Sequence, residues 1–256
     1  MTYLRTMVLV AALGLVGCVT TQVSGDASPV ANPKEAAQIN QELGIAYLRQ
    51  GNYELARLKL ERAVDGDPKL ATAHSALGLV YERLGAIDEA EDEYRRAARL
   101  AGDDPSVLNA LGVFLCLRRN EPDDALRYFD RALKYPLYPN RVMLFTNAGV
   151  CARKVDLKMA EDYFRQGLAL DLTSSELLLQ LSDVSFQQGN YLQSRGFLER
   201  YITTIGVSPA VLWLGVQIET ALGDARAAEI YGQRLKSEFP ISVETRMLLE
   251  QERDAG

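Results

Sequence analysis

Small and apolar residues recur among polar ones in a pattern that repeats along most of the chain. In its first occurrence Leu43–Gly44 and Tyr47 precede a Gly51–Asn52 pair, which small and apolar residues follow at positions 56, 60 and 63. The leucine–glycine pair returns at Leu77–Gly78 and at Leu111–Gly112, each time 34 residues further on. This period indicates a solenoid of helical hairpins, because one hairpin cannot bury its apolar stripe and stacked neighbours can.

Each repeat predicts two helices joined by a tight turn. Gly44 has no side chain, so a second helix can approach the first closely at that point. Gly51 and Gly85 follow the first helices, where glycine readily takes the left-handed conformation that ends a helix. Ala56 and Leu60 then lie on one stripe of the second helix, facing the first.

This order of small and aromatic residues is the tetratricopeptide signature, so we expect an all-α, right-handed superhelix of about six units and a C-terminal capping helix. The expected tetratricopeptide domain covers residues 35–256, with units at about 36–69, 70–104, 105–140, 141–173, 174–207 and 208–240 and a cap at 241–256. The third unit departs from the pattern. Arg118–Pro122 replaces the glycine turn, the second helix is one residue out of register, and a longer loop follows at Tyr135–Asn140.

The N-terminus has the features of a targeting segment. Residues 1–17 combine Arg5 with an apolar run that is too short to span a bilayer, which predicts a signal peptide. The run ends in Leu15-Val16-Gly17-Cys18, which resembles the bacterial lipobox, so we expect lipidation at Cys18. The residue directly after this cysteine is Val19, which resembles a signal for sorting to the outer membrane. Residues 18–34 lack periodicity and predict a flexible linker.

Composition narrows the function further. The net charge is −6, and we find no basic stripe of the kind that nucleic acid requires; Arg118–Arg119 is expected to be a solvated helix end. His74 is the single histidine, and we expect it to pack in the core. No catalytic constellation or phosphate loop is found. We therefore expect no enzyme activity, metal, cofactor or small-molecule substrate.

Cys116 and Cys151 lie on the expected first helices of adjacent units. A disulfide between them is geometrically possible if the register is right, and the compartment that a lipobox implies is oxidising. Two buried, reduced cysteines are the alternative, since free cysteine is often buried.

The central repeats resemble one family of tetratricopeptide proteins more than the others. The segments are Leu111–Cys116, Ala125–Ala132, Pro136–Tyr138 and Asn147–Cys151, and together with the lipobox they resemble the PilW/PilF family of type IV pilus biogenesis lipoproteins. The resemblance implies a pilotin: an outer-membrane, periplasm-facing lipoprotein that helps the secretin subunit to localise and multimerise. It also favours pairing of the two cysteines.

Two other functions remain open from the sequence. One is a scaffold for another envelope machine, such as outer-membrane protein insertion. The other is a lipoprotein enzyme of cell-wall metabolism, or its regulator, although the polar groups that such an enzyme needs are not found in the sequence.

A partner groove is expected on the concave face, where first helices turn their outward side chains toward a ligand. The candidate residues lie one, four or five positions after Gly44, Gly78 or Gly112. They are Ile45, Leu48, Arg49, Leu79, Glu82, Arg83, Val113 and Leu117. Aliphatic residues there are not needed for the hairpin seam, so they predict an apolar groove. The alternative is that they pack against neighbouring first helices.

Overall fold

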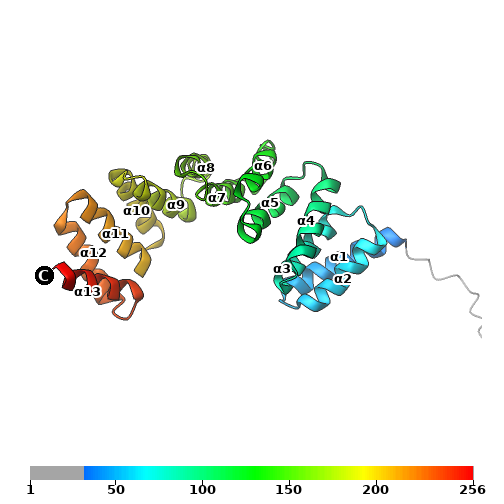
Figure 1. Ribbon diagram of the computed structural model, residues 1–256, viewed down its shortest axis with the longest axis horizontal. Helices are drawn as coiled ribbons and strands as arrows, with labels where there is room; N and C mark the ends of the chain where they lie inside the picture. The colour runs from blue at the N-terminus through cyan, green and yellow to red at the C-terminus, as the bar shows by residue number, and fades with distance from the viewer. Residues whose placement is uncertain (1–31, 256) are drawn as a thin grey trace, which may run out of the picture.

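The computed structural model describes residues 32–255, all in helices and short connections (Figure 1). The expected signal peptide, Cys18 and most of the expected linker lie outside the described residues. The helices are α1 Pro33–Arg49, α2 Tyr53–Gly66, α3 Ala71–Leu84, α4 Ile87–Ala101, α5 Pro105–Phe114, the π-helical turn η1 Leu115–Arg119, α6 Pro122–Leu133, α7 Arg141–Ala152, α8 Leu157–Leu170, α9 Ser175–Gln187, α10 Tyr191–Ile205, α11 Pro209–Leu222, α12 Ala225–Glu238 and α13 Val243–Ala255.

Consecutive helices pair into hairpins, and the hairpins stack into an arch (Figure 1). In the middle of the arch α6 and α8 lie on the outer side, while α5 and α7 lie on the inner side. Each expected unit contains one such pair, and α13 closes the C-terminal end. The fold is the all-α tetratricopeptide superhelix that the repeat predicts.

The recurring glycines are contact points between the two helices of a hairpin. A β-carbon at Gly149 would lie within 3 Å of three ring carbons of Phe164, and one at Gly112 would crowd Phe129 in the same way. Both phenylalanines are fully buried. The glycine on the first helix therefore makes room for the large residue that the second helix inserts, which explains why the two recur at a fixed spacing.

The irregular third unit has a physical explanation in its first helix. After Phe114 the α-helix widens into a π-helical turn, which takes up one extra residue. Asn120 then ends it with φ 58°, in the left-handed conformation that Gly85 provides in the second unit with φ 81°. The extra residue therefore shifts α6 by one position without unstacking the hairpin.

One boundary differs from the expectation, and one expected helix end makes an additional contact. The first helix begins at Pro33, inside the segment expected to be linker, because Asn32 caps it by accepting a hydrogen bond from the backbone of Lys34 at 3.2 Å. At the expected solvated end, Arg118 is exposed as expected, but it is also paired with another unit. Arg118 Nε lies 2.7 Å from Glu82 of the preceding unit. The π-helical turn and the left-handed Asn120 re-aim these side chains toward the second unit.

The last helix closes the stack as a cap. Ser242 caps the start of this helix by accepting a hydrogen bond from the backbone N–H of Thr245 at 3.1 Å. Leu248 of α13 is buried against Leu235 of α12. Within residues 32–255 no helix is long and apolar enough to cross a bilayer.

Candidate partner-binding groove

A groove of about 450 Å³ opens between the first helices of the N-terminal three units, α1, α3 and α5. Its walls are mostly aliphatic and small side chains with hydroxyl groups at intervals, and they comprise Ile45, Leu48, Arg49, Thr72, Ser75, Ala76, Leu79, Tyr94, Ser106, Val107 and Ala110. Four of the eight residues expected from the sequence line it: Ile45, Leu48, Arg49 and Leu79.

The hairpin geometry explains why these four residues meet. Ile45 and Leu79 each follow the glycine that contacts the second helix, so their side chains point away from that seam. Both are only partly buried, and Leu48 lies one turn beyond Ile45 on the same side of α1. Stacking α1 beside α3 therefore places the three aliphatic side chains along one strip.

The other four expected residues lie elsewhere. Val113 packs, half-buried, against the central hydrophobic core, and Leu117 is 57% exposed on the π-helical turn. Arg83 is exposed and does not line the groove. Glu82 is held by hydrogen bonds to the second and third units. The third unit enters the groove instead through the first turns of its α5 helix, at Ser106, Val107 and Ala110.

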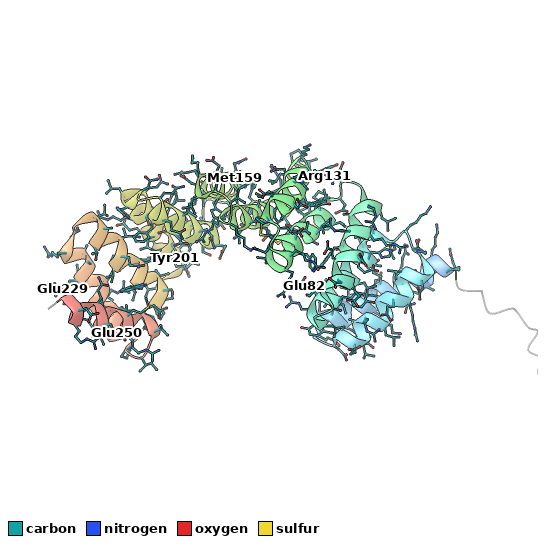
Figure 2. All side chains as sticks on the ribbon, viewed as in Figure 1. Glu82, Arg131, Met159, Tyr201, Glu229 and Glu250 are labelled. Carbon is teal, nitrogen blue, oxygen red and sulfur yellow. A yellow bond between two sulfur atoms is a disulfide. The ribbon has the colours of Figure 1, made fainter. Side chains whose placement is uncertain are left out.

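Tyr94 forms part of the groove although it belongs to a second helix. Its hydroxyl donates a hydrogen bond to Glu82 at 3.2 Å, and Glu82 in turn accepts one from Arg118 at 2.7 Å (Figure 2 labels Glu82 on the inner side of the arch). Burial raises the pKa of Tyr94 far above its usual value, and the nearby Glu82 charge adds to the effect. The tyrosine is therefore a fixed, neutral wall of the groove.

Sequence reasoning missed the contribution of Tyr94 and of the start of α5. Tyr94 stands at a position of the repeat that packs against a glycine, Gly78, so its sequence signature is that of a core residue. Only the three-dimensional structure shows that its flank also reaches the groove. The start of α5 could have been found from Asp104–Pro105, a pair that is typical of a helix start. In the structure the Asp104 carboxylate caps the helix by accepting a hydrogen bond from the backbone N–H of Ser106 at 2.8 Å.

The chemistry of the groove suits binding rather than catalysis. Its one charged lining residue is Arg49. The hydroxyls of Thr72 and Ser106 donate to Gln41 and Asp104 and can still accept a hydrogen bond from a peptide N–H, while the hydroxyl of Ser75 can donate or accept. An apolar strip with sparse polar groups is the usual composition of a pocket for a peptide side chain or an amphipathic helix. Within residues 32–255 no cluster of three or more histidine, cysteine or acidic residues is arranged to hold a metal ion.

His74 has a structural position. The side chain is 1% exposed, its Nδ1 lies 2.5 Å from Glu93, and its Nε2 lies 3.1 Å from the carbonyl oxygen of Pro68. Both neighbours are hydrogen-bond acceptors, so the imidazole joins α4 to the turn that precedes α3. The ring faces the hairpin seam and not the groove.

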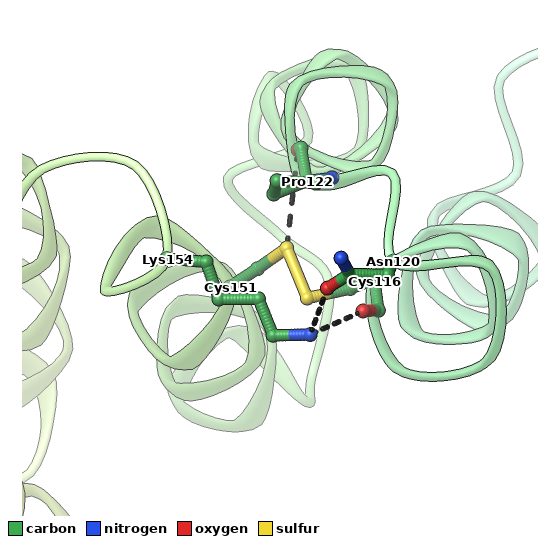
Figure 3. The surroundings of a disulfide bond; sticks show 5 residues. All are labelled: Cys116, Asn120, Pro122, Cys151 and Lys154. Atoms are coloured by element: carbon green, nitrogen blue, oxygen red, sulfur yellow. Dashed lines mark hydrogen bonds between the residues drawn. A yellow bond between two sulfur atoms is a disulfide. The ribbon is translucent and has the colours of Figure 1, made fainter.

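A disulfide joins Cys116 of the π-helical turn to Cys151 of α7, with their Cα atoms 5.9 Å apart (Figure 3). Lys154 completes the link, because its Nζ lies 2.7 Å from the carbonyl oxygen of Cys116 and 3.0 Å from the side chain of Asn120. The third and fourth units are thereby fastened together at the place where the regular helix is interrupted.

Comparisons with known proteins agree with this architecture. The tetratricopeptide repeat family profile matches residues 42–105. The type IV pilus assembly protein PilF of Pseudomonas aeruginosa is 31% identical over 248 residues, which are 95% of this chain and 97% of that protein.

Two solved structures are similar over nearly their whole length. The crystal structure of PilW, described as a widely conserved type IV pilus biogenesis factor, is 30% identical with a TM-score of 0.75, covering 83% of this chain and 98% of that one. The structure of Pseudomonas aeruginosa PilF is 28% identical with a TM-score of 0.74, covering 86% and 99%.

The fold and the groove define a tetratricopeptide repeat scaffold, a class of protein that acts by holding other proteins. The sequence identity to PilF extends along almost the entire chain, so it identifies one family within this class. The chain belongs to the PilF/PilW family of type IV pilus biogenesis proteins.

Proposed function

We propose that this chain is a non-enzymatic pilotin: an outer-membrane lipoprotein that binds the type IV pilus secretin subunit and supports its localisation and multimerisation. Family membership supports a role in pilus biogenesis. The observation that carries the binding step is the apolar groove across α1, α3 and α5.

The groove has the form that a short protein segment requires. It runs across three helices, so an extended strand or an amphipathic helix of the partner can contact several units at once. Arg49 and the hydroxyls beside the aliphatic strip supply polar contacts that fix the register of such a segment. We assign this segment to the secretin subunit.

The lipid anchor is the second part of the proposal, and it rests on the sequence. Leu15-Val16-Gly17-Cys18 supports diacylation of Cys18, and Val19 supports sorting to the outer membrane with the folded part facing the periplasm. The described fold begins at Asn32, so a short tether would join it to the lipid. The N-terminal groove would then lie closest to the membrane, where the secretin assembles.

The proposal is tested with charged substitutions in the groove. Ile45→Asp and Leu79→Asp each place an unpaired carboxylate on the apolar strip, which should prevent the partner from binding. We therefore expect both variants to lose secretin multimers, pili and twitching motility. Leu58→Asp is the matched control, because Leu58 is 40% exposed on α2 and lies outside the groove. Circular dichroism and melting of each variant establish that the fold is intact.

The readouts also separate this function from the other two. Secretin multimers, outer-membrane protein insertion and cell lysis are scored separately in the deletion strain and in each variant. A defect confined to multimers and motility supports the pilotin. Folded groove variants that assemble full multimers would overturn the groove assignment, and a deletion strain with normal multimers would overturn the function itself.

A further inference from the structure

A second and larger pocket, of about 570 Å³, lies between α6, α7 and α8 and shares no lining residue with the N-terminal groove. Met159 belongs to it, and Figure 2 shows this residue on the outer side of the arch. Its volume is in the range of pockets that hold small ligands or single peptide side chains. The proposed pilotin role makes no use of this face.

One wall of the pocket is apolar. Leu133 closes α6, Phe145 belongs to α7 and is 5% exposed, and Met159 lies in the first turn of α8 and is 39% exposed. A methionine side chain is flexible and polarisable, so it adapts to the shape of an aromatic or aliphatic guest. This wall therefore fits an apolar group.

The carboxylates of the pocket are already engaged within the protein. Each of the three accepts a hydrogen bond at 2.5–2.8 Å: Asp130 from the hydroxyl of Tyr163, Asp156 from the backbone N–H of Met159, and Asp162 from Lys158. Gln166 donates to the carbonyl oxygen of Asp162 at 3.2 Å. Each of these groups therefore has at least one hydrogen-bond partner among the described residues.

Arg141 is the exception among the polar residues that line the pocket. Its guanidinium lies 5.3 Å from the ring centre of Phe145, and its Nε is buried with no hydrogen-bond acceptor within residues 32–255. A buried donor without an acceptor is uncommon in folded proteins. A planar guanidinium that lies over an aromatic face can offer its two terminal NH₂ groups to a carboxylate.

We propose that this pocket binds a peptide carboxylate attached to a bulky apolar group, with the carboxylate on Arg141 and the apolar group against Phe145 and Met159. The carboxylate comes from an aspartate or glutamate side chain or from a chain end. The lining carries three acidic and two basic side chains, so the net charge of the pocket is negative and does not attract an anion. Recognition therefore depends on direct contact with Arg141.

Methionine-methyl NMR of the full chain tests this site, since the sequence holds only five methionines and Met159 is the one in the pocket. The probes are N-acetylphenylalanine, its amide, and the α-amide of N-acetylphenylalanyl-glutamic acid. In the last probe the glutamate side chain carries the single free carboxylate. At least one of the two acids should shift the Met159 signal with a dissociation constant on the order of 1 mM, while the amide leaves it unchanged. Whichever acid binds identifies a terminal or a side-chain carboxylate, and Met247 on α13 serves as the distant reference.

Three variants make the assignment specific. Arg141→Gln should weaken acid binding by at least about tenfold, because it removes the charge-assisted pair, and Arg141→Lys should weaken it less. Asp162→Asn should strengthen it, because a negative charge near the carboxylate is removed. Equal shifts from the acid and the amide, no shift of Met159 by either acid, or weaker binding in Asp162→Asn would each overturn the proposal.

Discussion

Gly149 offers a sharp test of the rule that a small residue on each first helix makes room for a large one on the second. Replacing it by alanine adds a methyl carbon that would lie 2.3 Å and 2.5 Å from two ring carbons of Phe164. Favourable carbon–carbon contacts lie at about 3.5–4.0 Å, so the ring would have to move by more than 1 Å. Phe164 is fully buried in the central core, and close-packed neighbours oppose that movement.

The size of the effect follows from two opposing contributions. Overpacking a core by one methyl group costs about 1–3 kcal/mol, and the rigid ring at Gly149 favours the upper end. Alanine regains about 1 kcal/mol over glycine in a helix interior. Gly149→Ala should therefore lose about 2 kcal/mol of unfolding free energy, which lowers the melting temperature by about 4–8 °C for a chain of this size.

Gly196→Ala is the matched control, because Gly196 is exposed inside α10 and an added β-carbon there meets nothing within 4 Å. This variant should gain about 0.5–1 kcal/mol from helix propensity alone. Urea unfolding followed by circular dichroism measures both variants. A Gly149→Ala protein as stable as wild type, or one stabilised like Gly196→Ala, would refute the close-contact explanation of the repeat.

Three further predictions concern the lipid anchor, the Cys116–Cys151 disulfide and the buried carboxylate of Glu161. Cys18→Ala should abolish palmitate labelling and reduce outer-membrane secretin multimers; labelling that persists would exclude the lipobox assignment. Cys116→Ala with Cys151→Ala should lower stability by up to about 4 kcal/mol through the freed loop, and thiol counting on unfolded, unreduced wild type should find neither cysteine free. Burial alone would raise the pKa of Glu161, but hydrogen bonds from Arg165 and Gln193 outweigh it and lower the pKa. Such a group stabilises the fold at neutral pH and loses this contribution as pH falls through its folded-state pKa, so Glu161→Gln should cost about 1–3 kcal/mol at pH 7 and less in acid; a penalty independent of pH would contradict this reasoning.

The regular part of the fold was predictable from the sequence because it depends on local rules. The 34-residue spacing from Gly44 to Gly78 reflects one close helix contact per hairpin, and the residues that satisfy this contact are visible in the sequence. The third unit was predictable as an irregularity but not in its form. A π-helical turn and a left-handed asparagine depend on how α5 packs against α6, and the sequence has no distinct signal for them.

The groove was predictable on its N-terminal side and not on the other. Ile45 and Leu79 come from regular units, so their direction follows from helix periodicity. Val113 occupies the equivalent position in the third unit and packs half-buried against the same core cluster as Leu79, but it does not line the groove. Glu82 was expected to face a ligand, but Arg118 reaches back from the π-helical turn and holds it. Long-range pairing of this kind requires the three-dimensional structure.

Site-specific photo-crosslinking in cells can detect the proposed contact between the N-terminal groove and the secretin. A photoreactive residue at Leu79, inside the groove, should crosslink to the secretin subunit, and one at Leu58, exposed on α2 outside the groove, should not. The secretin adduct from position 79 should disappear when Ile45→Asp is added. Secretin adducts from position 58 with none from position 79 would contradict it.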